Sequence, residues 1–399
     1  MTQLLTKIRR KKIHKGLLLY RLFQKLPVQA NLVLFESFLG RGYSDNPKAL
    51  YLKLQKQRPE LQLVWIFAKE PTAEVKAACP NWVLRNSPKY YYLMARAQYW
   101  IFNTRQPLSL KKRRETIYLQ TWHGTPLKRL GLDMDEVHMP GTNTEQYKKN
   151  FSAQAKEWNY LLSPNLYSSD IFKRAFDFRG LLLETGYPRN DLLYAPDRQQ
   201  QAKQIKQSLR LPPGKKVILY APTWRDDEFV KKGQYRFHLK LDLKQMQSRL
   251  GDDYIVLLRM HYLIAEHLDL AVFDGFAYDV SAYGDIAELY LISDLLITDY
   301  SSVFFDYAHL NRPMVFFTYD LEKYASVLRG FYFDFEAVVP GPLLKESDQV
   351  IDYIEDIATQ SKQYEDKYVA FQERFCSLDD GKASQRVVDG LFPPREKMK

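Results

Sequence analysis

The run ISDLLITDYSSVFFDY, residues 292–307, decides the fold class of this 399-residue chain. Its apolar residues 295–298 predict a buried strand, and the stretch from 303 to about 310 has the period of a helix. Asp299 and two serines lie between them, where the strand should end. An apolar strand that leads into a helix is typical of parallel α/β layers, whose ligands bind at the carboxyl ends of the strands.

Similar apolar runs alternate with helical patterns in two series along the chain. The second series has runs at 217–220, 254–258, 295–298 and 314–317. The first has runs at 32–35, 61–67, 99–102, 117–119, 160–162 and 181–183. A polar stretch at 198–210, followed by Leu-Pro-Pro-Gly, separates the two series. We therefore predict an α/β protein with two Rossmann-like domains facing across a cleft.

The same pattern suggests three parts. We place a basic segment at 1–30, a first Rossmann-like domain at 31–200 and a second at 201–399, whose last helices could pack back on the first.

The amino-acid composition limits the kinds of partner and the cellular compartment that we expect for this chain. Lys and Arg exceed Asp and Glu by 58 to 47, a formal charge of +11, which favours an anionic partner such as nucleic acid, anionic lipid or a phosphorylated substrate. The two cysteines, Cys79 and Cys376, lie far apart, which argues against a disulfide scaffold and favours a reducing cytosol. No run approaches the ~18 apolar residues of a membrane-spanning helix, and no cleavable signal is visible, so we expect the chain neither to cross a membrane nor to be exported.

The first 26 residues are strongly basic and hold no acidic residue. Apolar residues at 18, 19, 22, 23 and 26 follow helical spacing, which predicts a basic amphipathic helix suited to an anionic membrane surface. The pattern would be explained equally well by a solvated basic helix whose apolar stripe packs on the following domain. Packing on the domain and contact with the membrane could also occur together. The predicted membrane residues are Arg9, Arg10, Lys11, Lys12, Leu19, Leu22 and Phe23.

His123 is the first candidate for chemistry. It lies in TWHGTPLK (121–128), directly after the run at 117–119, so the expected strand would place it at the carboxyl edge of a sheet. A neutral imidazole there could take a proton from an attacking hydroxyl. A single His near a turn is more often a structural residue than a general base. The position of His123 at a strand end, and its neighbours, nevertheless favour the role of general base.

Two more strand ends carry polar groups. Arg259 and His261 follow the run at 254–258 and could hold phosphate oxygens of a departing nucleotide, although a surface ion pair beside a core His is the alternative. Ser301 and Ser302 could bind a pyrophosphate through hydroxyl and N–H groups, or simply cap the helix. Asp299 would repel phosphate unless it orients a His or contacts a ribose hydroxyl.

Two weaker loops also follow strands: APTWRD (221–226) and GYPRND (186–191). Each supplies an Arg at a sheet edge. The chain lacks GxGxxG after a strand, GxxxxGK[ST], HExxH and GxSxG, which argues against dinucleotide redox, P-loop, zincin and serine-hydrolase chemistry. The DMD at 133–135 is read as a polar loop, so no metal site is predicted, and a need for a divalent cation stays open.

Seven runs, in order along most of the chain, resemble the CDP-glycerol:poly(glycerophosphate) glycerophosphotransferase family of wall teichoic acid synthesis. They are FESFLGRGYSDNPKA (from Phe35), WHGTPLK (from Trp122), GYPRND (from Gly186), ILYAPTWRD (from Ile218), LRMH (from Leu258), ISDLLITDYSSVFFDY (from Ile292) and RGFYFDFE (from Arg329). The resemblance implies a glycosyltransferase type B fold, an N-terminal acceptor domain that docks on the membrane and a C-terminal domain that binds CDP-glycerol. It also implies that His123 and His261 are essential.

The loops and the resemblance together define two sets of predicted site residues beside these histidines. The donor- or phosphate-binding set is Arg259, Thr298, Asp299, Ser301, Ser302, Arg329, Thr223 and Arg225. The acceptor or cleft set is Trp122, Gly124, Thr125, Arg189, Asn190 and Asp191.

The function that this implies is transfer of glycerol phosphate from CDP-glycerol to a lipid-linked teichoic acid acceptor, with release of CMP. The acceptor would be an undecaprenyl-diphosphate disaccharide or its glycerol-phosphate-primed form, met at the cytoplasmic face of the membrane by a peripheral enzyme without an evident cofactor. The length mildly favours a primase or short-extension enzyme.

Three alternatives stay open. The first is a ribitol-phosphate transferase that uses CDP-ribitol, and the second is a sugar-nucleotide glycosyltransferase of the same fold. The third is a binding protein driven by charge, and here the absence of any RNA- or DNA-binding motif argues against nucleic acid.

Overall fold

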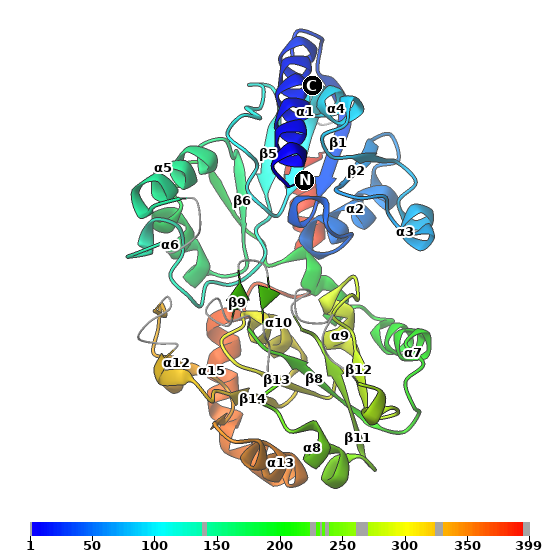
Figure 1. Cartoon of the computed structure of the whole chain (residues 1–399), viewed down its shortest axis with the longest axis vertical. Coiled ribbons are helices and arrows are strands. Elements are labelled where there is room, and N and C mark those ends of the chain that lie inside the picture. Colours follow the sequence, from blue (N-terminus) through cyan, green and yellow to red (C-terminus); the bar gives the residue numbers. More distant parts are fainter. Residues whose placement is uncertain are drawn as a thin grey trace. The chain divides into compact units, whose positions relative to one another are not determined.

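The computed structural model describes residues 2–137, 142–223, 229–231, 234–235, 239–260, 270–323 and 330–393; of residues 2–12, 229–231, 234–235 and 323 it describes the backbone but not the side chains. Two compact units make up the chain (Figure 1). The first comprises Met1–His123, Leu130–Asp191 and Leu378–Lys399, and the second comprises Gly124–Arg129 and Leu192–Ser377. This division differs from a single boundary near residue 200, because two short segments belong to the unit on the other side of it.

The first unit is built on a parallel sheet, which has seven strands in the described part of the chain. Their order is β3-β2-β1-β4-β5-β6-β7. Every pairing is parallel, as runs that are apolar throughout predict. The strands are β1 (Gln29–Glu36), β2 (Gln62–Phe67), β3 (Trp82–Leu84), β4 (Ala97–Phe102), β5 (Ile117–Gln120), β6 (Tyr160–Ser163) and β7 (Leu181–Glu184).

Helices cover this sheet and share its core. Phe35 of β1 stacks on Trp65 of β2 with ring centroids 5.9 Å apart, and Val387 of the last helix joins the same buried cluster. The C-terminal helix α16 packs against α2, so residues more than 300 positions apart close one core. The helices of this unit are α1 (Thr2–Phe23), α2 (Asp45–Gln57), α3 (Ala73–Ala78), α4 (Pro88–Arg96), α5 (Thr144–Ala155), α6 (Leu166–Ala175) and α16 (Ala383–Leu391).

The second unit repeats the plan with a parallel sheet of order β12-β11-β8-β13-β14-β15 among the described residues. Its central strands are buried except for Lys216 at the start of β8, and Ile218, Val256 and Ile297 belong to one cluster. A separate antiparallel pair joins β9 (Phe229–Lys231) and β10 (Gln234–Tyr235). The sheet strands are β8 (Lys216–Ala221), β11 (Tyr254–Leu258), β12 (Ala277–Asp279), β13 (Leu295–Thr298), β14 (Met314–Phe317) and β15 (Leu343–Leu344).

The polar stretch at 198–210, which separates the two series of strands, is mostly helical. It forms α7 (Arg198–Ser208), which packs against α9 (Ile286–Ile292) inside the second unit. The other helices described in this unit are α8 (Leu243–Leu250), α10 (Val303–Tyr307), α11 (Leu321–Lys323), α12 (Phe335–Val338), α13 (Ser347–Glu355), α14 (Ile357–Gln360) and α15 (Glu365–Phe375).

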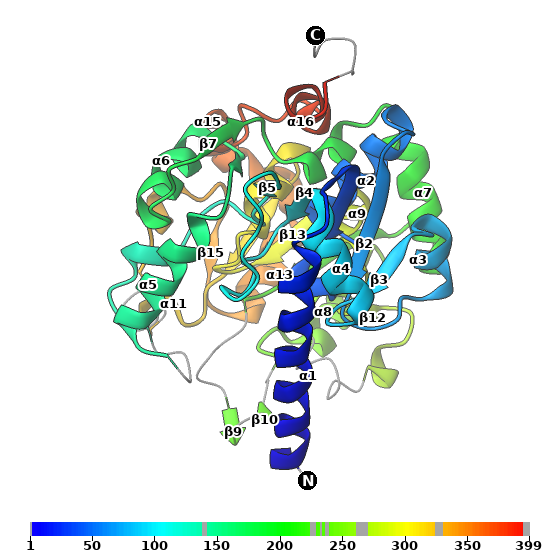
Figure 2. The ribbon, with the colours of Figure 1, turned by 90° about the horizontal axis from the view of Figure 1, so that it is seen from above.

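The basic N-terminal segment forms the long helix α1, which runs alongside α4 (Figure 2). Tyr20 is buried, and its hydroxyl donates to the carbonyl of Lys111 at 2.8 Å. Phe23 meets Tyr92 of α4 edge to face at 5.3 Å, and Leu19 is half-buried. Leu18, Leu22 and Leu26 are 53%, 56% and 40% exposed. One stripe of α1 therefore packs on the domain, while a second, outward stripe is formed by Leu18 and Leu22 and continued by Leu26 just past the end of the helix.

Candidate active site

The carboxyl ends of β4 and β5 bring two polar residues together. Asn103 follows the last residue of β4, and His123 lies three residues beyond the end of β5. The strands are parallel neighbours, so both residues lie at the same edge of the sheet, as the sequence predicts for His123.

The imidazole of His123 is fixed by one short contact. Its Nδ1 lies 2.7 Å from the backbone carbonyl oxygen of Asn103. Because a carbonyl oxygen only accepts hydrogen bonds, Nδ1 carries the proton and the lone pair of the neutral ring sits on Nε2. His123 is thus held in a tautomer that can accept a proton through Nε2.

Asn103 is itself fully buried and anchored at both ends of its amide. Its Oδ1 accepts from the backbone N–H of Phe38 at 2.8 Å. Its Nδ2 donates to Oδ2 of Asp45 at 2.5 Å. The residue that orients His123 is therefore tied to the loop after β1 and to the start of α2.

Asp45 and Arg189 form a buried ion pair next to this histidine. Nη1 of Arg189 lies 2.9 Å from Oδ1 of Asp45, and the two side chains are 9% and 4% exposed. The same Nη1 donates to the backbone carbonyl of His123 at 3.0 Å. Arg189, predicted as an acceptor or cleft residue, thus holds the backbone of His123 in place.

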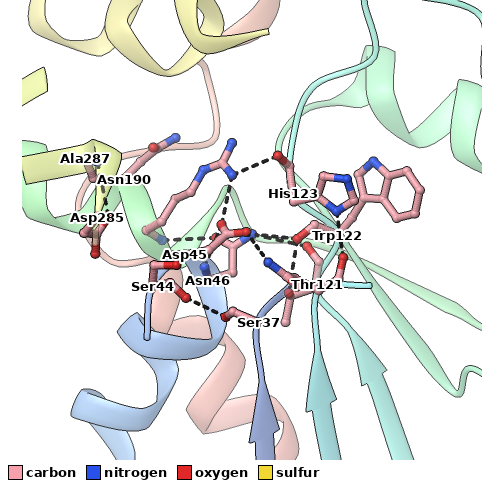
Figure 3. Close-up of polar contacts among 12 residues, drawn as sticks. Ser37, Ser44, Asp45, Asn46, Thr121, Trp122, His123, Asn190, Asp285 and Ala287 are labelled. Atoms are coloured by element: carbon pink, nitrogen blue, oxygen red, sulfur yellow. Dashed lines mark hydrogen bonds and ion pairs between the residues drawn. The ribbon is translucent and has the colours of Figure 1, made fainter. Parts of the chain in front are cut away.

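Asn46 closes the polar cluster (Figure 3). Its Nδ2 lies 3.3 Å from the carbonyl oxygens of both Thr121 and Trp122, and its Oδ1 accepts from the backbone N–H of Arg189 at 3.1 Å. The turn that carries His123 is therefore pinned from one side by buried amide and guanidinium groups.

Aromatic rings flank the imidazole. The Trp122 ring stacks on His123 with centroids 4.6 Å apart, and Phe38 meets it edge to face at 5.7 Å. Trp122 holds φ at 53°, a left-handed conformation that is uncommon for a bulky residue. Such strain at a candidate site fits a turn that aims its side chains for function.

The pKa of His123 is lowered below its ordinary 6.5, chiefly because burial disfavours the imidazolium. The Asp45 carboxylate and the Asn103 carbonyl raise the pKa, and the Arg189 and Arg105 guanidinium groups lower it. The net direction keeps His123 neutral near pH 7, as a general base requires.

Two residues of the predicted acceptor set have structural partners. The carboxylate of Asp191 accepts from the backbone N–H groups of Ala383 and Ser384 at 2.9 and 2.8 Å, which caps α16. Asn190 is buried and lies 3.4 Å from Asp379 through its Nδ2. These contacts tie the C-terminal segment to the rest of the first unit.

The segment directly after His123 belongs to the second unit. Arg129 donates its N–H to the carbonyl of Gly330 at 3.2 Å, and Lys128 forms an antiparallel bridge with Phe331. Gly124 lies against Ser302, since a Cβ atom on this glycine would come 3.0 Å from the serine Oγ. Thr125 is buried.

The strand ends of the second unit position the predicted donor residues. Nη1 of Arg259 lies 2.7 Å from the carbonyl oxygens of Val280, Ser281 and Tyr283, which fixes the guanidinium directly beyond β11. Ser302 occupies the N-cap position of α10 without a side-chain capping bond, so the capping alternative does not account for its hydroxyl.

Thr298 and Asp299 tie strands together. The Thr298 hydroxyl donates to the carbonyl of Ala221 at 2.7 Å, and Oδ1 of Asp299 accepts from the N–H of Thr223 at 2.8 Å. Both side chains are buried, so the carboxylate that seemed out of place beside phosphate joins the ends of β13 and β8.

Several predicted residues lie outside the described part of the chain: His261, Arg225 and Arg329, together with the side chains of Arg9, Arg10, Lys11 and Lys12. Sequence reasoning also missed three buried residues of the His123 cluster, namely Asp45, Asn46 and Asn103. Asn103 directly follows a predicted strand next to that of His123, which was a usable signal. Asp45 and Asn46 lie at the start of α2, where such residues are common without any ligand, and so gave no comparable signal.

Among the described residues, no group of three or more His, Cys, Asp or Glu side chains is placed to hold a metal ion. Within these same residues, no helix combines the length and apolarity needed to span a bilayer.

Two Rossmann-like sheets with polar groups at the carboxyl ends of their strands are the architecture of glycosyltransferase type B enzymes, which confirms the predicted fold class. The chain belongs to the CDP-glycerol:poly(glycerophosphate) glycerophosphotransferase family, whose model matches residues 18–393.

Named relatives agree with this family. The chain is 51% identical over 389 residues to the teichoic acid poly(glycerol phosphate) polymerase of Bacillus subtilis (strain 168), covering 97% of this chain and 52% of the relative. It is 46% identical to the teichoic acid glycerol-phosphate transferase of Staphylococcus aureus (strain NCTC 8325 / PS 47), covering 94% and 95%. A structure of the wall teichoic acid polymerase TagF with CDPG matches with a TM-score of 0.90 at 45% identity, covering 99% of this chain and 97% of that one.

The chain therefore spans about half the length of the first of these relatives and nearly all of the second. Ribitol-phosphate enzymes from Bacillus spizizenii are more distant, at 31–32% identity.

Proposed function

We propose that this protein transfers glycerol phosphate from CDP-glycerol to a lipid-linked teichoic acid acceptor and releases CMP. The observation that carries the proposal is the geometry of His123, a neutral imidazole whose Nδ1 bonds the Asn103 carbonyl at 2.7 Å and whose Nε2 can accept a proton. Family membership supplies the substrate class, since the family is named for CDP-glycerol and poly(glycerophosphate).

The proposed reaction is a displacement at phosphorus. An acceptor hydroxyl gives its proton to Nε2 of His123, and its oxygen attacks the β-phosphorus of CDP-glycerol. The bond from this phosphorus to the oxygen of CMP breaks, so glycerol phosphate is transferred and CMP leaves with the electron pair. The protein's contribution is to position the groups and to stabilise negative charge on the leaving phosphate.

The donor is assigned to the second unit. Arg259 supplies a fixed guanidinium, and Ser301 and Ser302 supply hydroxyl and N–H groups beyond β13. Thr298, Asp299 and Thr223 support these groups through the contacts that join their strands. His261, Arg225 and Arg329 stay in the donor set on the sequence alone: His261 and Arg225 because each follows a strand and lies in a family motif, and Arg329 because of the family resemblance.

Glycerol is favoured over ribitol because the relatives at 46–51% identity are named for glycerol phosphate, whereas the ribitol-phosphate enzymes share 31–32%. Three relatives at 48–51% identity are named poly(glycerol phosphate) polymerases, which favours extension of a primed acceptor over priming. A glycerol-phosphate-primed acceptor is thus the proposed substrate.

A peripheral position on the cytoplasmic face of the membrane completes the proposal. The outward stripe of Leu18, Leu22 and Leu26 alternates along the sequence with the exposed cations Arg21 and Lys25, as expected for a segment that rests on an anionic bilayer. The predicted contact residues are revised accordingly: Leu22 is on the outward stripe, whereas Phe23 packs on Tyr92 of α4 and Leu19 is half-buried.

The test is CMP release by the purified protein, with CDP-glycerol or CDP-ribitol and a primed or unprimed lipid-linked disaccharide analogue. Product mass counts the units added. We expect CMP from CDP-glycerol with the primed acceptor, and His123→Gln should abolish turnover while retaining donor binding. CMP from CDP-ribitol alone would support the ribitol alternative, and no CMP from either donor would return attention to a sugar-nucleotide glycosyltransferase.

A further inference from the structure

Asn103 makes three separate contacts, and all of them serve the turn of His123. Its carbonyl accepts from Nδ1 of His123, its Oδ1 accepts from the N–H of Phe38, and its Nδ2 donates to Asp45. A fully buried amide with both of its polar ends satisfied has one orientation, so its backbone carbonyl is held in one place.

We infer that Asn103 and Asp45 are positioning residues for His123 and that the ion pair of Asp45 with Arg189 sets the charge balance around its imidazole. This inference rests on the proposed function, in which His123 is the base. It adds Asn103 and Asp45 to the residues that support catalysis. It also gives the buried pair of Asp45 and Arg189 a role in catalysis besides its role in the fold.

Asp45 cannot be replaced by its own amide without loss. Its Oδ2 accepts from Asn103, and its Oδ1 accepts from the backbone N–H of Asn46 at 2.8 Å and from Arg189. An Asn in this position offers one acceptor oxygen, so one of the two sides would meet an N–H₂ group with another donor opposite it. Asp45→Asn therefore loosens either Asn103 or Arg189.

Three charged groups act on His123 in the described part of the chain. Asp45 raises its pKa, whereas Arg189 and Arg105 lower it. Arg105 stacks on Phe151 with its guanidinium carbon 4.1 Å from the ring centroid, and its Nη1 donates to Gln154 at 2.7 Å. The two members of the Asp45–Arg189 pair thus act on the base with opposite signs.

Because Asp45 and Arg189 change the pKa of His123 in opposite directions, their variants should shift the pH profile in opposite directions. Residues with a purely structural role would not do so. A base must be neutral, so activity is lost as pH falls through its pKa. Asp45→Asn removes the charge that favours imidazolium, which moves the acidic limb of kcat/KM to lower pH. Arg189→Gln removes a charge that disfavours imidazolium, which moves the limb to higher pH. We expect each shift to be about 0.5 pH unit or more.

Two further variants separate charge from position. Arg189→Lys keeps the charge, so the limb should stay near that of the wild type even where kcat falls. Asn103→Ala keeps the carbonyl but removes its anchors, and we expect kcat to fall by about tenfold or more with donor affinity unchanged.

Asn159→Ala is the matched control. Oδ1 of Asn159 accepts from a backbone N–H, that of Tyr118, at 2.9 Å, as Oδ1 of Asn103 accepts from Phe38. Asn159 precedes β6 at the opposite edge of the same sheet, so this variant should keep both the wild-type kcat and its pH profile.

The profiles are measured by CMP release between pH 5 and 9 with CDP-glycerol and a primed acceptor, and circular dichroism checks that each variant is folded. Opposite shifts for Asp45→Asn and Arg189→Gln support the inference. If Asp45→Asn does not fold, a shift in Arg189→Gln that is absent from Arg189→Lys carries the test. If the wild type is active but the two variants shift the limb in the same direction or not at all, the inference is overturned and the proposed function stands. If the wild type releases no CMP, the proposed function itself is overturned.

Discussion

Gly124 and Ser302 are in close contact, because a Cβ atom on Gly124 would lie only 3.0 Å from the Oγ of Ser302. The contact joins the residue directly after the proposed base to a serine assigned to the donor. This contact explains why residue 124 is a glycine. Its φ does not fall in the left-handed region, so a glycine is needed here because there is no space for a side chain, not because of an unusual backbone conformation.

Gly124→Ala should therefore weaken donor binding. The added methyl group must displace the Ser302 hydroxyl by a few tenths of an ångström, and we expect a loss of about 1 kcal/mol, roughly fivefold in the Kd for CDP-glycerol. Isothermal titration calorimetry measures this directly. Gly284→Ala is the control, because nothing lies within 4 Å of the position of its Cβ atom. Equal affinities in both variants would remove Ser302 from the donor site.

The wild-type enzyme should stay active below the ordinary pKa of histidine. Burial lowers the pKa of His123 below 6.5, so the imidazole remains neutral, and competent as a base, as the pH falls through 6.5. We expect the acidic limb of kcat/KM to lie below pH 6.5 when CMP release is followed across buffers of constant ionic strength. A limb well above pH 6.5 would show that another group governs the rate or that His123 is not the base.

The central architecture could be predicted because it follows from apolar runs. Each predicted run lies within or nearly coincides with an observed strand, as 32–35 lies within β1. The strands β3, β12 and β15 were missed because they are edge strands of two or three residues, too short to show a period. The helix α7 was missed because its residues are mostly polar.

The site could be predicted only where a residue follows a strand. His123 was found on that basis. Asp45 lies at a helix start instead, and only the folded structure brings it next to the residues that contact His123. The pairing of Asp45 with Arg189, 144 positions away, depends on how the start of α2 meets the segment that follows β7. Single-sequence patterns carry no signal for such long-range contacts.

Arg259→Lys should weaken the donor site although the charge is kept. Nη1 of Arg259 is held by three carbonyl oxygens at 2.7 Å, which leaves the rest of the planar guanidinium at a fixed angle beyond β11. A lysine ammonium that made the same contacts would offer no second nitrogen to a phosphate. We expect the Kd for CDP-glycerol to rise by about tenfold or more.

Arg312→Lys is the control for this substitution. Nη1 of Arg312 also donates to three carbonyls, those of Tyr290, Leu291 and Ser293, but Arg312 precedes β14 at the opposite edge of the sheet. It should lower stability without changing donor affinity. A similar loss of affinity in both variants would mean that Arg259 acts through the fold and not through the donor.

The outward stripe of α1 should control membrane binding. Replacing Leu18 and Leu22 by Gln removes two side chains that are 53% and 56% exposed, without touching the face that packs on α4. We expect the double variant to lose about tenfold or more in its partition onto anionic vesicles, because each buried leucine contributes about 1.5 kcal/mol or more.

The matched control for α1 replaces Leu166 and Leu181, which are 61% and 63% exposed on α6 and β7, by Gln. Co-sedimentation of both double variants is compared at low and high salt, because the cations of α1 should make binding weaker as the Debye length shrinks. A wild-type interaction that is insensitive to salt, or an equal loss in both double variants, would contradict docking through α1. Loss confined to the α1 variant, with CMP release from a soluble acceptor analogue unchanged, would separate membrane docking from catalysis.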